Sequence, residues 1–151
     1  MATLFAFLHH LAAFALVAAL VVEFVLIKGE LTAISARKIQ RTDLIFGVAA
    51  AVLLVVGLLR VVFFEKGVAY YLYSGAFIAK LSLFVIVGLL SIYPTLEFLA
   101  WSKDLKQDRV PAVDAGKLRR IRMIMHIELV GVVAVILFAA LMARGIGSFG
   151  Q

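Results

Sequence analysis

The sequence predicts an all-α fold, a transmembrane four-helix bundle that runs up-down-up-down with both termini outside. Hydrophobic residues make up 65% of the chain, whereas soluble domains contain about 45–50%. Four apolar stretches each reach the roughly 20 residues with which a helix crosses the hydrocarbon core. Each should be a helix, because an isolated strand cannot pair its backbone groups in lipid. Lys and Arg gather mainly between these stretches, as expected of an integral membrane protein.

The predicted spans lie within a single domain over residues 1–151 and cover residues 4–27, 44–64, 70–99 and 121–143. No Lys or Arg precedes the first span, and it is too long for the apolar part of a signal peptide, so we expect it to be retained. In the connection before the second span, Thr42 is expected to cap the helix, with Asp43 in its first turn. The short turn after residue 64 makes spans two and three antiparallel neighbours.

The distribution of Lys and Arg predicts the orientation of the chain. The connections at residues 28–42 and 102–120 hold most of the basic residues, and such loops favour the cytoplasmic side. The formal charge of +6 is therefore a topology signal and does not indicate nucleic-acid binding. The absence of cysteine excludes disulfides and thiolate metal sites. An interfacial aromatic belt is expected from Tyr70, Tyr71, Tyr73 and Trp101.

The candidate functional residues are the ionisable residues inside the predicted spans. A charge at mid-bilayer costs roughly 2.5–3.5 kcal/mol on insertion scales, so it usually faces protein, a partner or a cofactor. Because the helices alternate in direction, these residues fall into two layers. The outer layer holds His9, His10, Arg60 and Lys80, with Tyr73 beside them. The inner layer holds Glu23, His126 and Glu128, together with the other polar residues at that level, which are Asp43, Ser91, Tyr93, Thr95 and Glu97.

The outer layer is a candidate haem b site. Neutral histidine is an axial ligand of haem iron, and bundle cores commonly hold cofactors. We expect His9 or His10 to bind the iron, with Arg60 and Lys80 as charge partners. Helical periodicity aligns His9 with Glu23, but alanines leave the opposite side equally packable, so the choice between the histidines stays open. His126 lies about 24 Å away at 1.5 Å per residue, too far for the same iron.

Other interpretations of these residues remain open. Taken singly, the outer residues are also explained by an interfacial histidine, a snorkelling Lys80 and an Arg60 bound to lipid phosphate. Glu23, His126 and Glu128 are predicted to form a proton path or a structural pair. The chain would then be a non-catalytic subunit, an assembly factor or a small transporter, with a homo-oligomer or a larger membrane complex as its setting.

Small residues and one proline within the spans are predicted to serve helix packing. Pro94 is expected to kink the third span. Close helix approach is expected at Gly47, Gly57, Gly88 and Gly131.

Two resemblances add to this interpretation. One rests on Asp43, Gly57 and Arg60, then Lys66-Gly67 and Tyr70-Tyr71, Phe77 with Lys80, and Leu90-Ser91-Ile92-Tyr93-Pro94-Thr95 ahead of Trp101. This pattern resembles a bacterial family of four-span membrane proteins of unknown function, which implies a bacterial inner-membrane location.

The second resemblance is more distant and concerns an oxidoreductase family. A histidine in an Ala-rich first span, Phe77-x-x-Lys80 and an Arg-led fourth span resemble the HemJ-type protoporphyrinogen oxidases, which bind haem b. It implies that His9 or His10 binds iron and that Lys80 is a functional partner. The fourth span lacks that family's Asn-Glu-hydrophobic-Pro pattern, so the likeness implies haem binding rather than porphyrinogen oxidation.

Overall fold

Four long helices make up most of the protein. The computed structural model describes residues 1–64, 71 and 73–145. The long helices are α1 (Ala2–Lys28), α2 (Ala33–Leu59), α4 (Gly75–Ala100) and α6 (Ala115–Ala143), joined by the π-helical turn η1 (Arg60–Phe64) and the short α5 (Ser102–Lys106). A helix of 27 residues, such as α1, is about 40 Å long. All four are long and apolar enough to cross a membrane, which confirms the predicted all-α membrane protein.

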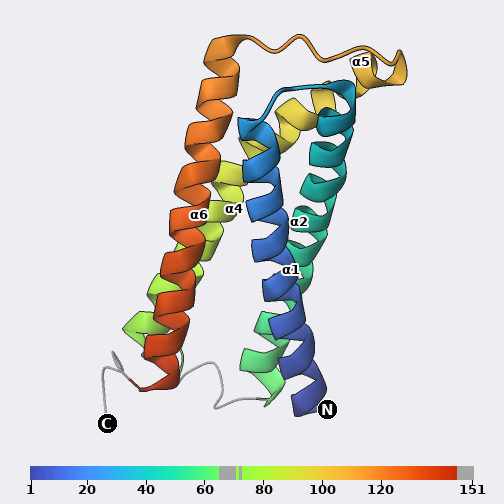
Figure 1. Cartoon of the computed structure of the whole chain (residues 1–151). Coiled ribbons are helices and arrows are strands. Elements are labelled where there is room, and N and C mark those ends of the chain that lie inside the picture. Colours follow the sequence, from blue (N-terminus) through green and yellow to red (C-terminus); the bar gives the residue numbers. More distant parts are fainter. Residues whose placement is uncertain (65–70, 72, 146–151) are drawn as a thin grey trace.

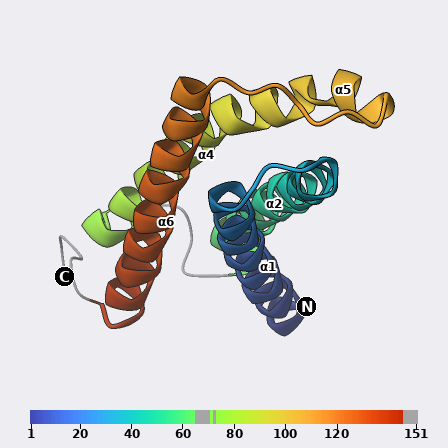
Figure 2. The same cartoon turned by 45° about the horizontal axis from the view of Figure 1, so that its top comes forward.

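The helices are arranged as two closely packed pairs. α1 packs along α2, and α4 packs along α6, while contacts between the pairs are fewer and run from α1 to α6 and from α2 to α4. Figure 1 shows the pairs close together at its upper end and further apart toward its lower end, and the tilted view in Figure 2 agrees. Large side chains of the core include Leu20, Ile27, Ile39, Phe98, Ile121 and Met125.

The second helix begins earlier in the sequence than predicted. Thr32 is its N-cap: the Thr32 hydroxyl accepts a hydrogen bond from the Ser35 amide at 3.1 Å, and the Ser35 hydroxyl accepts one from the Thr32 amide at 2.8 Å. Thr42 lies inside the helix, where its hydroxyl donates to the Lys38 carbonyl at 2.8 Å. The prediction that Thr42 caps the helix was therefore wrong, because the basic segment before it marks the edge of the apolar span and not the end of the helix.

α4 and α6 also start directly after a residue whose side chain caps the helix. The Asp114 carboxylate accepts from the Gly116 amide at 2.8 Å, so α6 starts at Ala115 and takes in residues 115–120, the end of the predicted third connection. The Ser74 hydroxyl accepts from the Phe77 amide at 3.3 Å and starts α4. The predicted turn after residue 64 and Tyr70 lie outside the described residues. α4 continues through Pro94, which is buried.

The four glycines expected at close helix contacts differ in how near the neighbouring helix lies. A Cβ atom on Gly131 would lie 2.6 Å from Val87 Cγ2, and one on Gly57 would lie 3.2 Å from His9 Cε1. A Cβ atom on Gly47 or Gly88 would meet nothing within 4 Å. Close helix approach is thus confirmed at Gly57 and Gly131, and the prediction was wrong for Gly47 and Gly88.

Two of the residues expected in an aromatic belt are packed inside the protein. Trp101 is buried against Phe98, with ring centroids 5.0 Å apart, and Tyr71 is buried against Phe77 at the same separation. Tyr73 is exposed, as an interfacial side chain would be.

Candidate functional site

A cavity lies where the two helix pairs separate. Its volume is about 340 Å³, within the roughly 300–1,000 Å³ typical of sites for small molecules. It is lined by the start of α1, the end of α2 with η1, the first half of α4 and the end of α6. Most of its wall is apolar and comes from Leu53, Leu54, Leu58, Val61, Phe77, Leu81, Phe84, Val135, Ile136, Ala139 and Met142.

The outer residues singled out from the sequence all line this cavity. His9 and His10 come from α1, Arg60 from η1 and Lys80 from α4. Arg60, Lys80 and His10 are each close enough to act electrostatically on the His9 ring. The Lys80 ammonium also lies 5.2 Å from the centroid of the Phe77 ring. The cavity therefore combines two imidazoles and two cations with an apolar interior.

His9 is held against α2. Its Cε1 and Nδ1 atoms would lie 3.2 and 3.5 Å from a Cβ atom on Gly57, so the absence of a side chain there makes room for the ring. The backbone of Leu53 is within hydrogen-bonding reach of the same ring. His9 Nδ1 is buried and has no hydrogen-bond partner among the described residues. Backbone contacts thus orient the imidazole, and its Nδ1 is buried beside Gly57 of α2.

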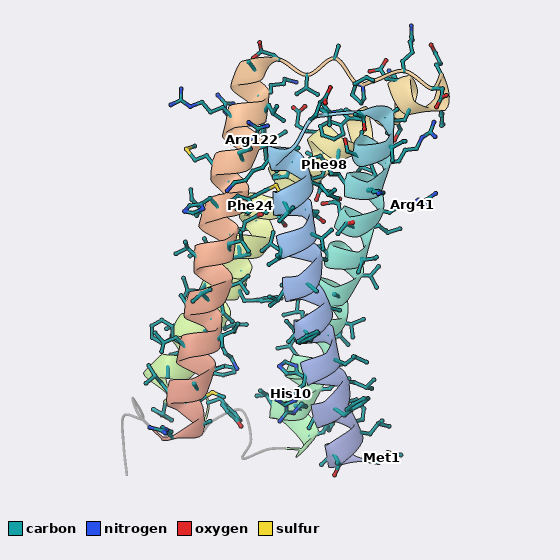
Figure 3. The ribbon with its side chains drawn as sticks, in the orientation of Figure 1. Met1, His10, Phe24, Arg41, Phe98 and Arg122 are labelled. Carbon is teal, nitrogen blue, oxygen red and sulfur yellow. The ribbon has the colours of Figure 1, made fainter. Side chains whose placement is uncertain are left out.

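His10 differs from His9 in its surroundings. It is exposed, and its Nδ1 lies 2.6 Å from the Ala6 carbonyl oxygen of its own helix, to which it donates when protonated. The two imidazoles meet edge to face with centroids 6.0 Å apart. Figure 3 shows His10 in the lower half of α1, at the level where the helix pairs are apart. Both rings therefore have one nitrogen near a backbone group, and only the unpartnered nitrogen of His9 is buried in the protein.

Two features of the cavity were missed by sequence reasoning. The chain ends α2 in a π-helical turn at the cavity wall, and such turns are frequent at functional sites. Tyr71, expected at the membrane interface, instead lines the cavity. The sequence signal for the turn was weak, since Arg60–Phe64 continues the apolar pattern of the preceding helix.

The inner residues are only partly brought together. Glu23 on α1 and Glu128 on α6 are 3% and 2% exposed. Asp43 on α2 lies close to them, since Glu23 interacts electrostatically with Asp43 and with Glu128. His126 is exposed and packs 5.9 Å from the Phe24 ring. Its neighbour two residues on, Glu128, points into the protein, because residues two apart on a helix face different directions.

The side chains of the described residues form no cluster typical of a metal-ion site. No group of three or more His, Asp and Glu side chains among these residues could hold such an ion. A haem iron differs, since the porphyrin supplies most ligands and the protein supplies the axial one.

Comparison with known proteins gives a family and no close relative of known activity. No curated protein and no solved structure matches the chain. A family described as "Predicted membrane protein" (DUF2214) matches residues 1–147. The match covers nearly all of the chain and agrees with its four long apolar helices. This integral membrane protein therefore belongs to the DUF2214 family.

Proposed function

We propose that this protein binds haem b in the cavity between its helix pairs and serves a redox or haem-related role in the membrane. The observation that carries the proposal is the buried, unpartnered Nδ1 of His9 beside two cationic side chains in one apolar cavity. Buried polar atoms nearly always have a hydrogen-bond partner, so one without a partner suggests a ligand.

The residues of the cavity fit the chemistry of haem. Haem is a flat apolar macrocycle with an iron that accepts an imidazole nitrogen and with two propionate carboxylates. His9 offers the nitrogen, and the apolar wall offers a surface for the macrocycle. Arg60 and Lys80 would pair with the propionates, since an anionic group inside a membrane needs a counter-charge.

The chain's own residues would set the properties of the site. The Leu53 backbone and the space at Gly57 orient the His9 ring, as outer contacts orient metal-binding histidines in general. The apolar wall excludes water, which strengthens the interaction of Arg60 and Lys80 with an anion. When bound, haem supplies one-electron redox chemistry.

Absorption spectroscopy tests the proposal. Protein purified in detergent from cells supplied with a haem precursor should show a Soret band. His9→Ala should remove most of it, whereas His10→Ala should leave a larger part. His126→Ala is the matched control, because this histidine packs against Phe24 and does not line the cavity. Arg60→Ala and Lys80→Ala should each weaken haem binding several-fold.

Two outcomes would contradict haem binding. One is a wild-type protein without a Soret band, and the other is a band unchanged when His9 and His10 are replaced together. A co-purifying membrane protein in place of haem would support the alternative role as a non-catalytic subunit, assembly factor or transporter.

The setting in the cell is part of the same proposal. We place the chain in a bacterial inner membrane, running up-down-up-down with both termini outside, alone or as a homo-oligomer. The connection between α1 and α2 and the segment from α5 to the first turns of α6 carry most of the Lys and Arg residues. By the positive-inside rule this end of the bundle lies in the cytoplasm.

A further inference from the structure

Three carboxyl groups from three different helices come together in the interior of the protein. Glu23 of α1, Asp43 of α2 and Glu128 of α6 are 3%, 8% and 2% exposed. They are close enough to interact electrostatically, Glu23 with both others and Glu128 with Asp43. α4 contributes Thr95, whose hydroxyl donates to Asp43 Oδ1 at 2.8 Å. We call Glu23, Asp43 and Glu128 the carboxyl cluster; its members come from α1, α2 and α6, and α4 adds the hydrogen bond from Thr95.

The carboxyl cluster has no basic counterpart in the described part of the chain. None of its members forms an ion pair there. Basic residues at the same end of α1 and α6 have other contacts: Arg122 Nε donates to the Ile27 carbonyl at 2.9 Å, and Lys28 Nζ lies 4.1 Å from the Phe24 ring centroid. On α4, Glu97 pairs with Lys117 at 3.0 Å, and His126 packs against Phe24.

Hydrogen bonding to the Oε1 atoms of Glu23 and Glu128 does not compensate for a charge on these two groups either. The Oε1 atoms of Glu23 and Glu128 are buried and without a hydrogen-bond partner among the described residues. Burying an ionised carboxylate without a partner is so costly that such a group takes up a proton or a cation instead. The described residues include no group of three or more His, Asp and Glu side chains placed to hold a metal ion, whereas a proton needs only one carboxyl oxygen.

We propose that Glu23, Asp43 and Glu128 form a proton-binding site, in which Glu23 and Glu128 each carry a proton on a carboxyl oxygen at neutral pH. When a carboxylate takes up a proton, one O–H bond forms and one negative charge is removed. When the proton is released, that bond breaks and the carboxylate regains its charge. No other reactant takes part. Thr95 holds Asp43 in place through its hydrogen bond.

This site is separate from the cavity. Glu23 follows His9 by 14 residues on α1, which is about 21 Å along the helix axis at 1.5 Å per residue. Figure 3 shows Phe24, the neighbour of Glu23, in the upper part of the bundle and His10 in the lower part. Proton binding at the carboxyl cluster therefore does not depend on what occupies the cavity.

Infrared spectroscopy of the full-length protein in lipid nanodiscs tests the proposal. At neutral pH the wild-type protein should show the carbonyl stretch of protonated carboxyl groups, and labelling its glutamates with ¹³C should shift this band. Glu23→Gln and Glu128→Gln should each remove part of the band. Glu30→Gln is the matched control, because Glu30 is an exposed glutamate beside the end of the same helix and should leave the band unchanged.

Three outcomes would overturn the proton site. The first is a wild-type protein without the band at neutral pH, which would mean ionised carboxylates. The second is a band that does not shift on ¹³C labelling of glutamate, a test that requires no variant to fold. The third is a band that disappears on adding sodium or magnesium chloride at constant pH, which would indicate a metal-ion site.

Discussion

Buried polar side chains in the interior of the protein differ in whether they have a hydrogen-bond partner among the described residues. Asp43 has the Thr95 hydroxyl as its partner. His9 Nδ1, Glu23 Oε1 and Glu128 Oε1 are buried without a partner among the described residues. Because an unsatisfied buried polar group costs about 1–3 kcal/mol, these three atoms support our proposals of a haem ligand and of bound protons. They lie in the two regions that carry our proposals.

A glycine opposite His9 provides a test at the level of one residue. Gly57→Val should displace the His9 ring, because even the first carbon of a side chain would lie 3.2 Å from Cε1. We expect haem binding to fall at least tenfold, with a smaller loss for Gly57→Ala, measured by haem titration of the purified protein.

The control for this substitution lies on the same helix. Gly47→Ala adds a methyl group that meets nothing within 4 Å, so its haem affinity should equal that of the wild-type protein. Equal affinity of Gly57→Val and the wild-type protein would show that His9 does not need its observed position for binding.

Individual helices are defined by their capping residues, and not by the edge of the apolar stretch. α2 and α6 both begin within polar, basic segments, after Thr32 and Asp114. Outside the hydrocarbon core water can satisfy polar side chains, so a helix can extend beyond the membrane where its cap stabilises the first turn. These extensions place basic residues on the helix ends.

The capping box of α2 can be tested by comparing two threonines. Thr32→Ala should lower the free energy of unfolding by about 0.5–2 kcal/mol, because it leaves the Ser35 amide without its acceptor. Thr42→Ala should change the free energy of unfolding much less, since the Thr42 hydroxyl donates to the Lys38 carbonyl inside the same helix. Reversible unfolding in mixed micelles measures both values, and a larger cost for Thr42→Ala would contradict this assignment of the cap.

The whole molecule is built as two helix pairs that are close at one end and apart at the other. The divergence creates the cavity, and the close end holds the carboxyl cluster and most of the basic residues. The packing within a pair is tight where small residues permit it, as at Gly131 against Val87. One small bundle therefore contains an apolar cavity with basic residues in its wall and, nearer the other end, a group of buried carboxyl side chains.

Labelling of single cysteines tests the proposed orientation of the whole chain. The chain has no cysteine of its own, so Thr3→Cys and Arg109→Cys each give one reactive thiol at an exposed position. In intact bacterial cells whose outer membrane has been made permeable, a membrane-impermeant maleimide should modify Thr3→Cys and leave Arg109→Cys unmodified. The reverse pattern would show that both termini lie in the cytoplasm.

Hydropathy and charge were sufficient to predict four helical spans, because an apolar stretch of span length in lipid has few alternatives to a helix. The order of the spans also predicted that His9, His10, Arg60 and Lys80 lie at one level, and the structure places all of them around one cavity. Neither the position of the spans nor the level of a residue along the bundle depends on how each helix is rotated about its own axis.

Helix rotation and spacing required the three-dimensional structure. Membrane helices are apolar on nearly every side, so the rotation of most of these spans had to come from the structure. For this reason the sequence could not distinguish His9 from His10, and it could not select Asp43 from the other polar residues of the inner layer as the residue that interacts with Glu23 and Glu128. It equally could not separate Gly57 from Gly47, because the distance to the neighbouring helix depends on contacts between segments far apart in the chain.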